Sequence, residues 1–274
     1  MKWKRGGVSG DLEDQRSSGG GRGPGGLRIG LGGLVVLGLL SLVFKTDLIS
    51  PFMSGGGSAP PVSDPARDAS EQDAVEFVSF VLDDAQNVWG QKLSGYRKAK
   101  LVLFRDGVQS ACGSASAAAG PFYCPGDEKV YMDLGFFDEL RTRHRAPGEF
   151  AAAYVIAHEI GHHVQNVMGI ERRVRAMQKQ NRALENDLSV KMELQADCFA
   201  GVWAHSTAQR QLLESGDLES GLGAAAAVGD DRIQQESSGR IHPESFTHGT
   251  SAQRMQWFKR GYEHGDAGAC ETFN

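Results

Sequence analysis

The chain has 274 residues, a formal net charge of -5 and a hydrophobic content of 40%. This length allows one sizeable domain with appendages. The charge is small and no basic stripe with interleaved aromatic residues is present, which argues against a nucleic-acid partner.

The first 70 residues are predicted to lie outside the folded domain. Residues 1–28 are basic and rich in glycine, and a stretch such as SSGGGRGPGG cannot bury enough apolar surface to fold, so we expect a disordered tail. Residues 29–45 contain an uncharged apolar run roughly 24 Å long as a helix, short but sufficient for a bilayer core of about 30 Å if Arg28 and Lys45 reach the two surfaces. Residues 46–70 are interrupted by Pro and Gly and predict a linker.

The charges around the apolar run predict its orientation. Basic residues are concentrated before the run, whereas Lys45 is the basic residue close behind it. The positive-inside rule then places the N-terminus in the cytoplasm and the following domain outside it, in the periplasm of a Gram-negative cell. A cleaved signal peptide is the alternative, but no small-residue cleavage site directly follows the run.

Residues 71–274 predict one domain of the α+β class, predominantly helical with a small β-sheet. A helix is expected from Glu71 to about Gln91, with Ser70 as its cap. Residues 100–104 (KLVLF) and 129–137 (KVYMDLGFF) predict strands. Further helices are expected from about residue 147 to 167, from residue 187 or 189 to beyond 205, over 217–236 and over 251–262. Because the strands precede the long helices instead of alternating with them, the pattern favours α+β.

The four cysteines are an even number in a domain expected outside the cytoplasm, which permits two disulfides. Cys112 and Cys124 would close a short loop, and Cys198 with Cys270 would then tie a helix to the C-terminal end. Three pairings are possible. A structural zinc site is the rival interpretation, but the chain has no C-x-x-C pair to support it.

The residues HEIGH at positions 158–162 match the pattern H-E-x-x-H. On a helix His158 and His162 share one face, one turn apart, and can bind one Zn²⁺. Glu159 lies about 100° around the helix and can act as general base toward a zinc-activated water. Two structural histidines on an ordinary helix are the alternative. The apolar residues before the motif indicate a buried helix, where an unsatisfied histidine would be costly.

A catalytic zinc site needs a third protein ligand. An extended pattern with Gly and His after the motif fails, because Gln165 and Met168 occupy those positions. Glu193, on a later helix, can complete the site instead. Asp197 lies one turn further on and can accept a hydrogen bond from a ligand imidazole. Apolar neighbours indicate that this acidic pair is buried, whereas His163 is predicted to be a packing or surface residue.

These motifs resemble those of gluzincin-type zinc metallopeptidases, and more closely those of the bacterial neutral zinc metallopeptidase family. The likeness covers nearly the whole chain: MKWKR, DLEDQR, SACGSASAAAGPFYCPGDEKVYMDL, HEIGHHVQ, ELQADCFAGVWA and FTHGTSAQRMQWF. It implies a zincin-like domain behind an N-terminal transmembrane helix. It also implies one zinc per chain, held by His158, His162 and Glu193, with Glu159 as the catalytic residue.

The resemblance implies further roles. The segment 120–134 is similar to the edge strand that zinc peptidases place above the cleft, where a peptide substrate can add as an extra strand. His248 and Arg254 resemble a downstream His…Arg element of related membrane gluzincins, in which the histidine steadies the oxyanion. An exposed loop histidine is the alternative at 248, and Tyr123 and Tyr131 are further oxyanion candidates.

The expected function is that of a membrane-anchored zinc endopeptidase acting on peptides or proteins outside the cytoplasm. One alternative is a zinc-stabilised envelope module without catalytic activity, or a latent enzyme whose site is covered by the linker or by residues 171–188. A hydrolase of cell-wall peptides is another. The motifs indicate neither the substrate, nor the cleavage preference, nor the oligomeric state.

Overall fold

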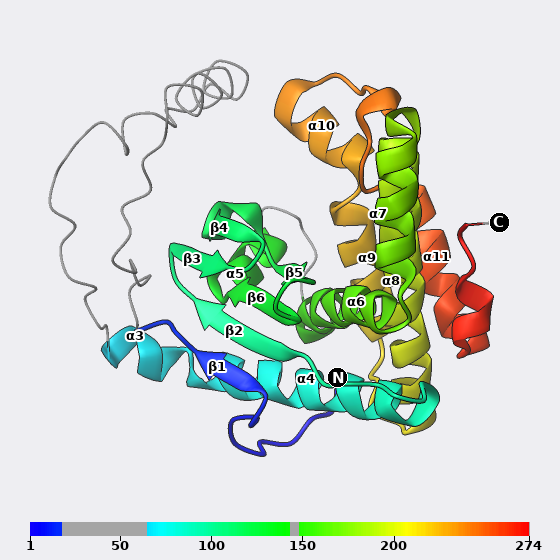
Figure 1. Cartoon of the computed structure of the whole chain (residues 1–274). Coiled ribbons are helices and arrows are strands. Elements are labelled where there is room, and N and C mark those ends of the chain that lie inside the picture. The colour runs from blue at the N-terminus through cyan, green and yellow to red at the C-terminus, as the bar shows by residue number, and fades with distance from the viewer. Residues whose placement is uncertain (18–64, 143–147, 274) are drawn as a thin grey trace, which may run out of the picture.

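The computed structural model describes residues 1–17, 65–142 and 148–273 (Figure 1). The predicted span over residues 29–45 and most of the predicted linker lie outside these ranges. Within them, no helix combines the length and apolar character needed to cross a bilayer. The described residues form a mostly helical domain with a small sheet, which confirms the α+β class.

The sheet has the strand order β1-β2-β6-β5 (Figure 1). Strands β1 (Leu12–Asp14), β2 (Lys100–Phe104) and β6 (Lys129–Asp133) are parallel, and β5 (Phe122–Cys124) pairs antiparallel with β6 at the edge. A separate hairpin is formed by β3 (Gly107–Ser110) and β4 (Gly113–Ser116).

Strand β2 is apolar from Leu101 to Phe104 because both of its faces are covered. Leu101 and Leu103 belong to the main core, which includes α4 (Gln72–Lys92) and the long helices. Val102 and Phe104 point to the other face and belong to a smaller cluster with Val108 of the hairpin. Side chains of a strand alternate between faces, so two covered faces require a continuous apolar run.

The remaining helices follow in the order α3, then α5 to α11. Their bounds are Pro65–Ser70 for α3, Gly135–Thr142 for α5, Glu149–Val167 for α6, Ile170–Gln180 for α7, Glu185–Gln209 for α8, Asp217–Ala227 for α9, Asp230–Ser238 for α10 and Ser251–His264 for α11. Predicted helices over 71–91, 147–167 and 251–262 are confirmed within two residues as α4, α6 and α11.

Four predictions about local structure are wrong. The strand expected over 129–137 ends at Asp133, whose carboxylate accepts the backbone N–H of Gly135 and so opens α5. The helix expected over 217–236 is interrupted at Gly229, where an added Cβ would lie 2.3 Å from the backbone N of Ser251. Ser70 does not cap α4, since its hydroxyl donates to the carbonyl of Arg67. The end of the predicted linker, residues 65–70, is helix α3.

The expectation of a disordered tail over residues 1–28 is wrong for residues 1–17. Strand β1 pairs with β2, with Leu12 opposite Leu101. The Trp3 ring packs on Phe77 at a centroid distance of 5.4 Å. Arg16 is 7% exposed and binds Asp14 and Glu71. Residues 1–17 are therefore part of the folded domain, through strand pairing, an aromatic contact and ion pairs.

This docking bears on membrane orientation. In the structure, residues 1–17 pack against the domain through strand β1 and through the hydrogen bond from Ser17 to Asp68. The predicted orientation, in contrast, separates the tail from the domain by a single crossing. The orientation stays a prediction and requires its own measurement.

Two close helix contacts position α6, α8 and α11. A Cβ added to Gly161 of α6 would lie 2.9 Å from the carbonyl oxygen of Ala196 on α8. A Cβ on Gly201 of α8 would lie 2.0 Å from the carbonyl oxygen of Phe258 on α11. Only glycine permits such backbone approaches, so these helices are packed backbone to backbone where they cross.

Candidate metal centre

The contact between α6 and α8 brings three ligand-type side chains together. Gly161 lies between His158 and His162 in the sequence, and its partner Ala196 lies between Glu193 and Asp197. His158 Nε2 lies 3.2 Å from His162 Nε2. Glu193 contacts both rings, with Oε2 3.2 Å from His158 Nε2 and Oε1 3.3 Å from His162 Nε2.

The donor set fits one zinc ion. His158, His162 and Glu193 each offer one ligand atom, and these atoms lie within 4.8 Å of one another. Two imidazoles and one carboxylate, with a fourth position left for water, make up the ligand set typical of catalytic zinc. The side chains of His162 and Glu193 are 17% and 19% exposed, so the group is reachable from solvent.

Opposite charges on neighbouring side chains outweigh the effect of burial on His158, His162 and Glu193. Burial disfavours a charged His158, but Asp197 and Glu193 outweigh it and raise the pKa of His158 to about 9. Burial likewise opposes charge on His162, whose pKa is nevertheless raised by Glu193 and, to a smaller degree, by Glu159. Burial would raise the pKa of Glu193, yet the two histidines hold it well below its usual range.

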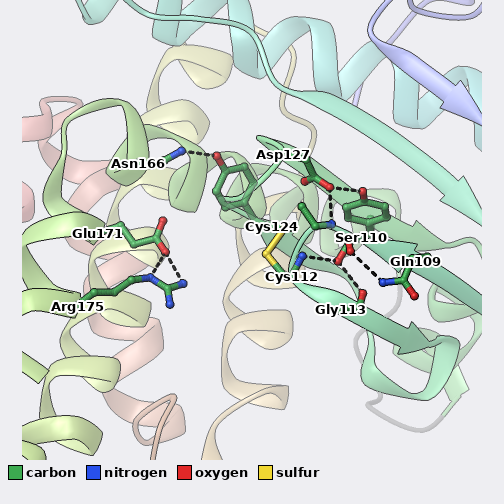
Figure 2. The surroundings of a disulfide bond; sticks show 12 residues. Gln109, Ser110, Cys112, Gly113, Cys124, Asp127, Asn166, Glu171 and Arg175 are labelled. Carbon is green, nitrogen blue, oxygen red and sulfur yellow. Dashed lines mark hydrogen bonds and ion pairs between the residues drawn. A yellow bond between two sulfur atoms is a disulfide. The ribbon is translucent and has the colours of Figure 1, made fainter. Parts of the chain in front are cut away.

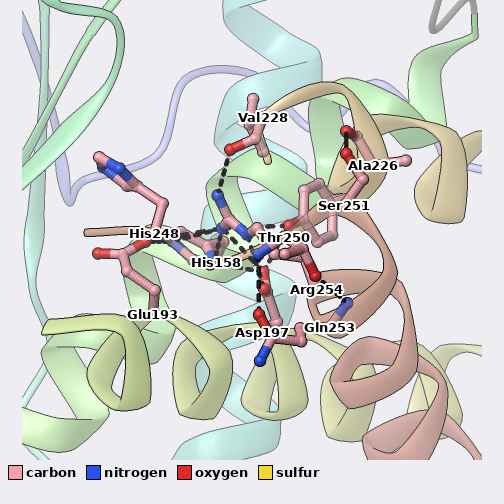
Figure 3. A network of polar contacts seen from close by, with 12 residues as sticks. His158, Glu193, Asp197, Ala226, Val228, His248, Thr250, Ser251, Gln253 and Arg254 are labelled. Carbon is pink, nitrogen blue, oxygen red and sulfur yellow. Dashed lines mark hydrogen bonds and ion pairs between the residues drawn. The ribbon is translucent and has the colours of Figure 1, made fainter. Parts of the chain in front are cut away.

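Asp197 orients His158, as predicted for a residue one turn beyond Glu193 (Figure 3). Its Oδ1 lies 2.9 Å from His158 Nδ1, so Nδ1 carries the proton and Nε2 is directed to the metal position. The hydroxyl of Tyr154 also donates to Oδ1, over 2.5 Å. Burial raises the pKa of this tyrosine well above its usual value, which keeps the hydroxyl a donor.

Arg254 completes this network from α11. Its Nε donates to Asp197 Oδ2 over 2.8 Å, and its Nη2 donates to Oδ1 over 3.0 Å. Burial alone would raise the pKa of Asp197, but Arg254 and His158 lower it, so the carboxylate stays charged. Arg254 is 3% exposed and also lies 3.6 Å from Glu193. It is thus a structural partner of the two acidic residues. Sequence reasoning had associated it only with His248.

Glu159, the predicted base, follows His158 on α6 and is 7% exposed. It is not one of the three residues whose ligand atoms converge, and its negative charge contributes to the raised pKa of His162. A carboxylate beside the ligands, and not among them, is in a position to accept a proton from water at the site.

His248 lies on the loop before α11, beside Glu193 (Figure 3). Its Nδ1 is 3.1 Å from Oδ1 of Asp230, and half of its side chain is exposed. The hydrogen bond with Asp230, aided by the charge of Glu193, raises the pKa of His248 against the effect of burial. The structure thus places this residue at the border of the site, outside the ligand cluster.

The other oxyanion candidates point elsewhere. The hydroxyl of Tyr123 is hydrogen-bonded to His163 Nδ1 and Asn166, and that of Tyr131 donates to Asp127 (Figure 2). His163 itself is fully buried and bonds through Nε2 to the carbonyl of Arg97, a packing role.

Two disulfides are present, Cys112–Cys124 and Cys198–Cys270. Figure 2 shows the first, which joins the turn after β3 to the end of β5. It fixes β5, the edge strand of the sheet, next to α6. The second ties α8 to the C-terminal turn at residues 267–270.

Comparisons with known proteins identify the family of the chain. The sequence model of a family described as "Putative neutral zinc metallopeptidase" matches residues 1–273. Uncharacterized protein YpfJ of Escherichia coli K12 is 46% identical over 286 residues, covering 100% of this chain and 99% of that protein. Uncharacterized protein Rv2575 of Mycobacterium tuberculosis H37Rv is 46% identical over 198 residues, covering 68% of this chain and 66% of that protein. No solved structure matches the chain significantly. The chain belongs to the neutral zinc metallopeptidase family.

Proposed function

We propose that the protein is a zinc-dependent endopeptidase whose metal is held by His158, His162 and Glu193. The observation that carries the proposal is the convergence of these three ligand atoms within 4.8 Å, with the buried Glu159 next to His158 on α6. Zinc bound there would supply Lewis acidity toward the scissile carbonyl and would lower the pKa of a bound water.

The side chains of the protein supply the proton transfers. Glu159 accepts the proton of the attacking water and delivers it to the leaving amine. His248, cationic when it carries protons on both ring nitrogens, donates from Nε2 to the oxyanion while Asp230 holds Nδ1. Asp197 keeps His158 in the tautomer that leaves Nε2 free for the metal.

The edge strand β5 supplies the substrate site. It pairs with β6 on one side and is the last strand of the sheet. An extended peptide can add to the outer side through main-chain hydrogen bonds, which are tolerant of sequence. This favours an unfolded or extended polypeptide as substrate over a compact small molecule.

The test uses the full-length chain, loaded with zinc, and an unfolded protein as substrate. Glu159→Gln should retain one zinc per chain and reduce cleavage by a factor of at least about 100. Glu193→Ala should lower zinc occupancy. Cleavage by Glu159→Gln at the parent rate would contradict the proposed base. Zinc binding without cleavage by the parent would leave the alternative of a zinc-stabilised binding module.

A further inference from the structure

We propose that Gln165 is a positioning residue for the ligand His162, and that the Cys198–Cys270 disulfide holds Gln165 in place through Gln195. The inference rests on the metal site proposed above. It assigns a role in metal binding to two buried amides and to the disulfide that joins α8 to the C-terminal turn.

The first link is the contact between Gln165 and His162. Oε1 of Gln165 lies 2.9 Å from Nδ1 of His162, one turn away on α6. An amide oxygen can only accept, so Nδ1 must carry the proton and Nε2 keeps its lone pair for a metal. Gln165 therefore does for His162 what Asp197 does for His158.

The orientation of the Gln165 amide follows from its other partners. Its Nε2 donates to the carbonyl of Met192 over 2.7 Å and to Oε1 of Gln195 over 3.1 Å. Both of these atoms are acceptors, so a flipped amide would place oxygen against oxygen. Gln165 has no exposed surface, and no water can replace these partners without a rearrangement.

Gln195 carries the connection to the C-terminal end. Its side chain is 1% exposed and its Nε2 donates to the carbonyl of Cys270 over 2.9 Å. Because the carbonyl of Cys270 can only accept, Gln195 must direct its NH₂ group to Cys270. Its Oε1 therefore faces Gln165 and accepts the hydrogen bond from Gln165 Nε2. Cys270 is bonded to Cys198, one turn beyond Gln195 on α8. The disulfide thus keeps the accepting carbonyl next to the helix that carries Glu193.

The two ligand histidines are held by different chemical devices. His158 has a charged partner, Asp197, that is itself paired with Arg254. His162 has a neutral amide, whose position depends on further amides and on a covalent bond. An amide suits position 165 better than a carboxylate, because a carboxylate would place a negative charge against the carbonyl oxygen of Met192. Loss of the disulfide should therefore loosen His162 and leave the support of His158 in place.

The experiment measures zinc affinity of the full-length chain by competition with a chelator, and the visible spectrum of the Co²⁺-loaded protein. Gln165→Met should lower zinc affinity about 10–100-fold and change the cobalt spectrum, as removal of a hydrogen-bond partner of a ligand does. Gln178→Met, the same substitution on α7, should change neither. Zinc affinity of Gln165→Met equal to that of the parent would overturn the role of Gln165.

The role of the disulfide is tested by removing each of the two disulfides in turn. Cys198→Ala with Cys270→Ala should lower zinc affinity about tenfold or more, whereas Cys112→Ala with Cys124→Ala should leave it within about twofold. Gln195→Leu keeps the disulfide, breaks the same chain of hydrogen bonds, and should lower affinity in a folded protein even if the first pair fails to fold. Equal effects of the two cysteine pairs, or normal affinity in Gln195→Leu, would refute the connection. A parent chain that binds no zinc would instead refute the proposed metal site.

Discussion

Asp197→Asn tests whether the buried charge network stabilises the domain as well as the metal site. Asp197 is fully buried and accepts four hydrogen bonds, from Tyr154, His158 and twice from Arg254. Asparagine would place an NH₂ group against donors and remove the nearer of the two carboxylates that pair with the buried Arg254, leaving only Glu193 at 3.6 Å. Removing one partner of a buried ion pair lowers the free energy of unfolding by about 3–5 kcal/mol.

For a domain of this size, each kcal/mol shifts Tm by about 2–4 °C, so Asp197→Asn should lower Tm by roughly 6–20 °C. The assay is thermal and urea unfolding of the full-length chain with chelator present, so that loss of zinc does not contribute. Asp187→Asn, an exposed position on the same helix, is the matched control and should change stability by less than about 1 kcal/mol.

A double variant separates charge burial from packing. Asp197→Leu with Arg254→Met removes both charges, and should be less destabilised than the sum of the two single variants, because neither charge is left unpaired. If Asp197→Asn unfolded at the parent temperature, or if the two single effects were additive, the assigned ion pair would not exist in solution.

Three further results are expected. Because the pKa of His158 is raised to about 9 in the metal-free protein, zinc must displace a proton, and apparent zinc affinity should rise about tenfold per pH unit between pH 6 and 8; a pH-independent affinity would contradict this charge state. His248→Ala should lower kcat about 100-fold or more with zinc content unchanged, measured by peptide cleavage and metal analysis, and an unaltered kcat would remove His248 from the mechanism. Trp3→Ala should lower the free energy of unfolding by about 2 kcal/mol in urea titrations, whereas no change would show that residues 1–17 are not docked on the domain.

The convergence of His158, His162 and Glu193 could be predicted because its signal is local. His158 and His162 lie one helical turn apart, and Glu193 and Asp197 repeat that spacing on a second helix, so helical periodicity alone places each pair on one face. Four cysteines in a small domain likewise restrict the possible disulfides. The contact of Arg254 with Asp197 joins residues 57 positions apart and depends on the packing of α11 against α8. No spacing rule predicts such a contact.

Composition alone does not predict the fold of the N-terminal segment, because its pairing partner lies far along the chain. Glycine-rich sequence around residues 17–26 indicated disorder, but Leu12 and the acidic residues beside it pair with a strand almost 90 positions further on. Helix α7 was missed for a similar reason. Most of its residues are polar, and only Ile170 and Val174 are buried, in a small cluster with Leu188.

The position of β1 at the rim of the sheet has a consequence for aggregation. The strand beneath it, KLVLF, is apolar, rich in residues that favour β-structure, and free of proline. Such a segment with an open edge is a template for pairing with other chains. Strand β1 covers that edge with three residues, two of which are acidic, and a short charged strand is a poor template. Proteolytic removal of the first 17 residues would therefore convert a protected sheet into one prone to self-association.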